Sequence, residues 1–128
     1  MSKYINFTTP IYYTNGEPHI GHVYTTVLVD VYKKFYELLG YNSRMATGTD
    51  EHGLKILKTA ISLGKTPQEL VDSVSSIFKD YWIKMGVSFD DYIRTTEERH
   101  IKTAQHFWEY LYQKGDIYLD RYDGLYCV

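Results

Sequence analysis

Two histidines, His19 and His22, stand three positions apart where a turn-rich stretch gives way to a helical pattern. Residues three apart share one face of a helix, so both imidazoles are expected to lie together at the helix N-terminus. The unpaired backbone N–H groups and the positive end of the helix dipole at such a terminus attract anions. Imidazole N–H groups there could also stabilise the negative charge that develops on a phosphate during displacement. The pattern therefore predicts a nucleotide-phosphate site.

The same two histidines have other interpretations. They could be ordinary surface residues on a capped helix, or two ligands of a metal ion, for which His52 is the only nearby candidate as a third ligand. Gly21 lies between them and has no side chain, so a flat ring could approach the backbone there. The residue types alone leave these alternatives open.

A second polar loop is expected at residues 47–53, which have the sequence T-G-T-D-E-H-G. A carboxylate such as that of Asp50 can hold an ammonium group through charge-assisted hydrogen bonds. The same aspartate could instead cap the helix that follows, and the two roles are compatible. A third polar group, Arg94 with Thr95 and Thr96, is interpreted as a helix cap with an arginine in a salt bridge.

The apolar periodicity predicts the elements that would position these residues. The expected elements are strands at 3–9, 43–48 and 89–94, helices at about 21–39, 54–63, 67–85 and 96–114, and a hairpin that joins 117–119 to 125–128. Two prolines and an Asn-Gly turn predict that residues 9–21 form a loop. The first helix is expected to pack on a sheet through an apolar stripe, Val23, Val27, Val31 and Phe35.

The order of these elements, strand then helix in repetition, predicts an α/β fold with a parallel sheet and crossover connections. The carboxyl ends of parallel strands meet at one edge of the sheet, where the sites of such folds lie. The loop at 9–21 and the stretch at 47–53 each follow a predicted strand. Asp50 is therefore expected at the same edge of the sheet as His19 and His22.

Length and composition bound the class of protein. The chain has 128 residues, 44% hydrophobic and 23% charged, which suits one globular domain. The net charge of −2 argues against a main role in gripping nucleic acid, which needs a basic patch. The single cysteine, Cys127, excludes an internal disulfide, and the sequence has no secretion signal and no apolar run of membrane-spanning length. A cytoplasmic protein without membrane contact is therefore expected.

The run H-I-G-H at residues 19–22 resembles the signature of the class I aminoacyl-tRNA synthetases. Three wider blocks, at residues 8–26, 47–56 and 92–97, resemble the methionyl-tRNA synthetase family in particular. They read T-T-P-I-Y-Y-T-N-G-E-P-H-I-G-H-V-Y-T-T, T-G-T-D-E-H-G-L-K-I and Y-I-R-T-T-E, in the family's order. The four-residue signature identifies only the class, whereas the T-T-P-I-Y-Y and G-T-D-E-H-G blocks select the methionine member.

This resemblance implies an enzyme that activates methionine with ATP to methionyl-adenylate, releases pyrophosphate and passes the methionyl group to tRNA. The ATP would act as its Mg²⁺ complex. The implied fold is the N-terminal half of a Rossmann-like nucleotide-binding domain over residues 1–115, followed by the truncated start of a connective insertion over residues 116–128. The implied partners are methionine, ATP and, mainly through regions outside this chain, tRNA.

Residue roles also follow from the resemblance. The implied catalytic residues are His19 and His22. The implied contacts to ATP are Pro10, His19, Gly21 and His22, with Gly21 beneath the adenine. The implied methionine-binding residues are Ile11, Tyr13, Asp50 and His52, with Asp50 paired to the substrate ammonium group. No zinc is expected, because Cys127, where many family members begin a zinc knuckle, is one ligand and a structural site needs four.

The resemblance covers an amino-terminal segment of the family, without the second half of the nucleotide-binding fold or the K-M-S-K-S loop. The 128-residue chain alone is therefore expected to be inactive. Three other functions stay open: a sister class I synthetase, a non-catalytic module that binds a nucleotide or a protein partner, and a small nucleotidyltransferase with the same histidine signature. The last of these would not need the G-T-D-E-H-G block.

Overall fold

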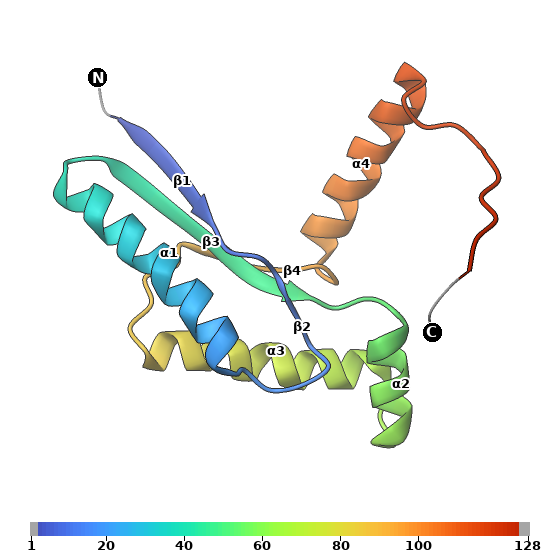
Figure 1. The fold of residues 1–128 in the computed structure, drawn as a ribbon, viewed down its shortest axis with the longest axis horizontal. Coiled ribbons are helices and arrows are strands. Elements are labelled where there is room, and N and C mark those ends of the chain that lie inside the picture. Colours follow the sequence, from blue (N-terminus) through green and yellow to red (C-terminus); the bar gives the residue numbers. More distant parts are fainter. Residues whose placement is uncertain (1–2, 126–128) are drawn as a thin grey trace. The chain divides into compact units, whose positions relative to one another are not determined.

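The computed structural model describes residues 3–125 (Figure 1). Its elements are β1 (Tyr4–Thr8), β2 (Tyr12–Tyr13), α1 (Ile20–Leu38), β3 (Asn42–Asp50), α2 (Leu54–Ser62), α3 (Pro67–Lys84), β4 (Asp91–Arg94) and α4 (Glu98–Lys114). The chain divides into two compact units, of which the first ends at Glu97 and the second begins at Glu98. The first unit holds the whole sheet, whereas α4 belongs to the second.

The sheet is parallel and is built around β3. Strands β1 and β2 pair with one side of β3, and β4 pairs with the other side. Because β1 and β2 pair with successive parts of β3, the chain from Tyr4 to Tyr13 follows β3 towards its carboxyl end. This arrangement confirms the prediction of an α/β fold with a parallel sheet and crossover helices.

Helices α1 and α3 cover one face of this sheet (Figure 1). Met45 of β3 belongs to the same buried core cluster as Phe78 and Trp82 of α3, both of which are 0% exposed, and two valines of α1 pack on this cluster. Burial of such large apolar side chains is the main favourable contribution to folding. The core therefore holds the carboxyl ends of β2 and β3 in place relative to α1.

The predicted packing of α1 is wrong in its second half. Val31 and Phe35 are 56% and 52% exposed, and the buried side chains of this helix are polar. The buried residues of α1 are Thr26, Asp30 and Lys33. Asp30 Oδ1 accepts hydrogen bonds from the backbone N–H and the hydroxyl of Ser88, at 2.8 and 2.7 Å. A polar side chain can be buried where a distant segment supplies its hydrogen-bond partners, and no helical periodicity reveals such a partner.

Two further predictions need correction. Residues 9–21 are not entirely a loop, because Tyr12–Tyr13 form the short strand β2 beside β3. Residues 47–53 are not entirely a loop either, because β3 continues to Asp50. Pairing with β2 on one side and β4 on the other extends β3 beyond the polar residues that suggested its end.

The C-terminal segment differs from the predicted hairpin. Residues 117–125 contain no strand, so the first arm of the hairpin is absent from the described residues. Most of the second arm, residues 126–128, lies outside them. The division of the chain into domains at 115/116 remains a prediction.

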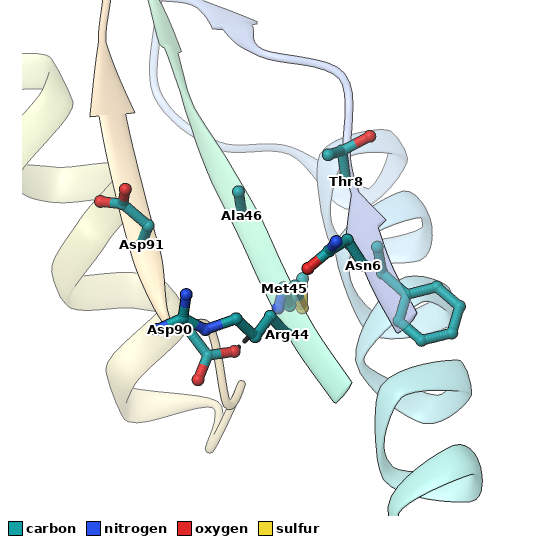
Figure 2. Close-up of a pocket in the computed structure, with 8 residues that line it drawn as sticks. Asn6, Thr8, Arg44, Met45, Ala46, Asp90 and Asp91 are labelled. Carbon is teal, nitrogen blue, oxygen red and sulfur yellow. Dashed lines mark hydrogen bonds between the residues drawn. The ribbon is translucent and has the colours of Figure 1, made fainter. Parts of the chain in front are cut away.

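The face of the sheet opposite α1 and α3 carries polar side chains of three strands (Figure 2). A cavity of about 320 Å³ opens there, lined by Asn6, Phe7, Thr8, Arg44, Met45, Ala46, Asp90 and Asp91. Asp90 Oδ2 accepts a hydrogen bond of 2.8 Å from the backbone N–H of Met45 (Figure 2). The residues of β3 that line this cavity belong to the first half of the strand, whereas Asp50 is its last residue. The cavity is therefore separate from the edge at which Asp50 lies.

Gly48 is required where β3 and β4 approach each other. A Cβ atom at this position would lie 1.9 Å from the carbonyl oxygen of Ile93, its register partner in β4. We expect Gly48→Ala to destabilise the protein by roughly 1–3 kcal/mol or more, because the two backbones must separate. Urea unfolding followed by tryptophan fluorescence measures this change. Gly16→Ala is the matched control, since a Cβ there has nothing within 4 Å, and equal stability of the two variants would contradict the prediction.

Candidate active site

The two histidines line a cavity of about 380 Å³ at the N-terminus of α1. The residues around it are Ile11, Tyr12, Tyr13, Asn15, Gly16, Glu17, His19 and His22. Four of these, Ile11, Tyr13, His19 and His22, are among the site residues predicted from the sequence. The cavity is thus built from β2, the turn that follows it and the first turn of α1.

The imidazoles of His19 and His22 cap the helix that carries them. His19 Nδ1 accepts a hydrogen bond of 3.2 Å from the backbone N–H of Gly21, and His22 Nδ1 accepts one of 3.2 Å from the backbone N–H of His19. The rings stack with centroids 3.7 Å apart. Because each Nδ1 is an acceptor, the neutral form of each ring carries its hydrogen on Nε2, which remains a donor.

This capping changes which donors the N-terminus of α1 offers to an anion. The backbone N–H groups of His19 and Gly21 are occupied by the imidazoles, so they are not free donors for a phosphate. The Nε2–H groups are the donors that the first turn of α1 offers in their place. Gly21 also has a local role: a Cβ there would lie 3.1 Å from Cε1 of His19, so a larger residue would push on the capping ring.

His22 rests on aromatic side chains of the core. Its ring lies 4.7 Å from that of Tyr12 and 5.1 Å from that of Phe78, measured between centroids. The Tyr12 hydroxyl in turn forms a 2.8 Å hydrogen bond with the hydroxyl of Thr26 on α1. Burial lowers the pKa of His22, and the nearby charge of His19 lowers it further. His22 is therefore held in one orientation and is uncharged near neutral pH.

Sequence reasoning did not single out Tyr12. No sequence signal distinguished Tyr12, because Ile11, Tyr12 and Tyr13 are all apolar or aromatic and only the pairing of β2 with β3 decides which of them faces inward. Tyr12 is 6% exposed and faces the core, whereas Tyr13 is 56% exposed. The inward tyrosine is the one that supports His22.

The titration of His22 tests this environment. We expect its imidazole to titrate below the ordinary histidine pKa, as measured from the pH dependence of its ring signals by NMR. His19→Asn should raise the pKa of His22, because the repelling charge is removed. The pKa should stay below the ordinary value in that variant, since Tyr12 and Phe78 still bury the ring. An unshifted His22 in the unmodified protein would contradict the described packing.

Asp50 lies at the same edge of the sheet as the histidines. It ends β3 and is the register partner of Tyr13 in β2, which itself lines the cavity beside His19 and His22. Paired residues of neighbouring strands point to the same face, so the side chains of Asp50 and Tyr13 share a face of the sheet. The chain order brings the two polar stretches together as predicted.

Four predicted site residues are not among those that line the cavity: Pro10, Gly21, Asp50 and His52. Pro10 is exposed in the connection between β1 and β2, and Gly21 lies behind the ring of His19. His52 is exposed, and its Nε2 lies 3.2 Å from the carbonyl oxygen of Thr95. This places His52 beside the segment that follows β4.

The side chain next to Asp50, Glu51, was considered from the sequence only as a residue that could line the site together with His52, but it does not line the cavity. It is 0% exposed and forms an ion pair with Arg94, with Oε1 and Nε 2.8 Å apart. The interpretation of Arg94 as a salt-bridging arginine is confirmed. The sequence did contain a signal for this ion pair. Glu51 follows one predicted strand and Arg94 ends the next, so both were expected at the carboxyl edge of the sheet.

Among residues 3–125 no group of three or more His, Cys, Asp or Glu is placed to hold a metal ion. Cys127, the residue on which the zinc expectation rests, lies outside the described residues. Within the same part of the chain, no helix combines the length and the apolar character needed to cross a membrane.

Comparison with known proteins bears on this site. A family model described as tRNA synthetases class I (M) matches residues 5–128. The chain is 50% identical over 126 residues to the methionine–tRNA ligase of Halalkalibacterium halodurans, a match that covers 98% of this chain and 19% of that protein. It is 48% identical over 121 residues to the methionine–tRNA ligase of Campylobacter jejuni, covering 94% of this chain and 19% of that protein. The chain thus spans about a fifth of the length of these curated relatives.

A solved structure agrees with the sequence matches. Mycobacterium tuberculosis methionyl-tRNA synthetase in complex with methionyl-adenylate superposes with a TM-score of 0.91 at 38% identity, covering 94% of this chain and 24% of that chain. The fold is accordingly that of a class I synthetase catalytic domain, with a Rossmann-like parallel sheet. Since the family model spans nearly the whole chain, this chain belongs to the class I tRNA synthetases of the family described as (M).

Proposed function

We propose that this chain forms the amino-terminal part of a methionine–tRNA ligase active site, which activates methionine with ATP and transfers the methionyl group to tRNA. The supporting observation is the cavity at the carboxyl edge of the sheet, where the imidazole pair of α1 meets the β2–β3 edge that ends in Asp50. Relatives named methionine–tRNA ligase and a structural match that contains methionyl-adenylate support the same choice.

In the proposed first step, a carboxylate oxygen of methionine attacks the α-phosphorus of ATP. A new P–O bond forms, the bond to the β-phosphate oxygen breaks, and pyrophosphate leaves. The roles of His19 and His22 are to donate Nε2–H hydrogen bonds to phosphate oxygens as charge builds on them. Their Nδ1 atoms are held by backbone N–H groups, which orients the donors before the substrate arrives.

The proposed methionine pocket uses the residues on the β2 side of the cavity. Ile11 and Tyr13 are 42% and 56% exposed and offer an aliphatic and an aromatic wall. A thioether packs well against such walls. Asp50 would pair with the substrate ammonium group, and His52 would stand at the outer side of this pocket.

The remaining roles are also proposals. Pro10 and Gly21 would contact ATP, which would enter as its Mg²⁺ complex. Most tRNA contacts would come from parts of the protein beyond this chain, which carries a net charge of −2. We also propose that the protein acts in the cytoplasm, because charged tRNA is used there.

Methionine-dependent exchange between ATP and pyrophosphate, assayed on the complete protein, tests this function. We expect exchange with methionine and none with leucine, isoleucine or valine. Exchange with one of these other amino acids would identify a sister synthetase. The absence of exchange with any amino acid would favour a non-catalytic binding module.

A further inference from the structure

We propose that Glu51 and Arg94 form a positioning clamp, which holds the backbone on both sides of Asp50 and so sets the direction of its carboxylate. This inference rests on the proposed function of Asp50 in binding the substrate ammonium group. Neither clamp residue lines the cavity, so both would act through Asp50 and are positioning residues.

The Glu51 carboxylate is surrounded by donors. Arg94 Nε donates to Oε1 at 2.8 Å, and Arg94 Nη2 donates to Oε2 at 2.9 Å, which makes a two-pronged ion pair. The hydroxyl of Thr49 donates to Oε1 at 2.7 Å, and the hydroxyl of Thr96 donates to Oε2. A two-pronged ion pair of this kind fixes the relative orientation of the two side chains in addition to pairing their charges. Few orientations of the glutamate satisfy all four donors at once.

These contacts join both neighbours of Asp50 in the chain. Thr49 and Glu51 are buried, 0% and 3% exposed, and are linked to each other by the Thr49 hydroxyl. The Thr95 hydroxyl accepts from the backbone N–H of Glu51 at 2.9 Å, and the Thr95 N–H donates to the carbonyl oxygen of Thr49 at 3.3 Å. Asp50 is therefore held between two anchored residues, and its own side chain points to the opposite face of the strand.

The outer end of the clamp reaches α3. Arg94 Nη2 donates to Asp72 Oδ1 at 2.5 Å, and the Asp72 side chain is 52% exposed. An exposed ion pair contributes little to stability. Removing one partner of a buried ion pair is more costly, because it leaves the other charge buried without a counter-charge. Burial opposes the charged form of Glu51, but hydrogen bonds from Arg94, Thr96 and Thr49 lower its pKa below the usual value. Glu51 is thus ionised at neutral pH, and the clamp depends on Glu51 more than on Asp72.

Glu51→Gln in the complete enzyme tests the clamp. The amide has the size of the carboxylate but turns an N–H group towards Arg94 or Thr96. We expect the methionine KM in the exchange assay to rise roughly tenfold or more, because a small misplacement of a binding group has effects of this size. The ATP KM and the number of active sites, measured by titration, should stay as in the unmodified enzyme. Arg94→Lys keeps the charge but removes the fork, and should raise the methionine KM in the same way if Glu51→Gln does not fold.

Two measurements separate positioning from general damage. The first is the inhibition constant of methionine without its amino group, which cannot contact Asp50 and should bind equally to the unmodified enzyme and to Glu51→Gln. The second is a double-mutant cycle, in which Glu51→Gln should add little to the methionine KM once Asp50→Asn is present. Asp72→Asn is the control for removal of an exposed partner of Arg94 and should change the methionine KM far less than Glu51→Gln.

The outcomes are distinguishable from failure of the proposed function. An unmodified enzyme without methionine-dependent exchange would overturn the function itself. A second outcome would overturn the clamp alone. In it, the unmodified enzyme shows normal exchange and Asp50→Asn raises the methionine KM, but Glu51→Gln and Arg94→Lys leave the methionine KM unchanged. A Glu51→Gln enzyme that loses affinity equally for ATP, methionine and the amine-free analogue would also overturn it, since that pattern indicates a structural role.

Discussion

Replacing His22 by alanine in the complete enzyme is expected to slow methionyl-adenylate formation by roughly one to three orders of magnitude, the usual effect of losing one transition-state donor. The ring is held over Tyr12 and Phe78, and its Nδ1 is engaged by the backbone of His19, so its Nε2–H is oriented before the reaction. Alanine supplies no donor at this place. Single-turnover measurement of adenylate formation at saturating methionine and ATP gives the rate directly.

The effect of His22→Ala must be separated from its structural part, because His22 also completes the cap of α1. Methionine affinity, measured at equilibrium, should stay nearly unchanged, since the donor acts on phosphate. Helix content by circular dichroism reports whether the first turn is lost. Leu38→Ala is a control at the other end of α1, where the side chain is 88% exposed. A normal rate of adenylate formation in His22→Ala would remove this histidine from the proposed chemistry.

Replacing Asp50 by alanine is expected to raise the methionine KM sharply, because truncating one partner of a buried charge pair typically has an effect on the order of 2–5 kcal/mol. Asp50 ends β3 beside Tyr13, at the edge of the cavity that the histidines line. The ammonium group of methionine would lose its counter-charge there. ATP affinity should be spared, since the phosphates bind at the N-terminus of α1.

Steady-state exchange kinetics with methionine and ATP varied separately test the effect of Asp50→Ala. Asp80→Ala is the matched control, since it removes an exposed carboxylate on α3 and should change neither KM. If ATP affinity fell in Asp50→Ala and methionine affinity did not, the ammonium-binding role would be wrong. The proposed clamp of Glu51 and Arg94 would then also be wrong, because it rests on this role of Asp50.

Much of the local structure could be predicted because it depends on neighbouring residues. The helix at Pro67–Lys84 begins as expected, with Thr66 Oγ1 accepting from the backbone N–H of Glu69 at 3.2 Å and the Glu69 carboxylate accepting from the backbone N–H of Thr66 at 2.8 Å. Such capping boxes involve residues three apart and can be identified in the sequence. The position of His19 and His22 together at the start of α1 was predicted for the same reason, since they are also three residues apart. That their imidazoles cap the helix was not predicted.

The contacts that could not be predicted join residues far apart in the chain. Glu51 and Arg94 are 43 positions apart, and Asp30 and Ser88 are 58 apart. Hydrophobic periodicity does not show that a polar side chain will find a buried partner, so Asp30 was missed and Val31 and Phe35 were wrongly placed on the sheet. The strand Tyr12–Tyr13 was also missed, since two residues carry no periodic signal and their pairing with β3 alone defines them.

By itself, the sequence determined the elements, their alternation and the motifs of the family. These depend on caps, turn residues and spacing, which act over a few positions. Only the tertiary structure decided that Tyr13 and Asp50 are neighbours, that His22 rests on Tyr12 and that Glu51 is paired with Arg94. The physical reason is that strand pairing and buried ion pairs join groups that come together only when the whole sheet has formed around β3.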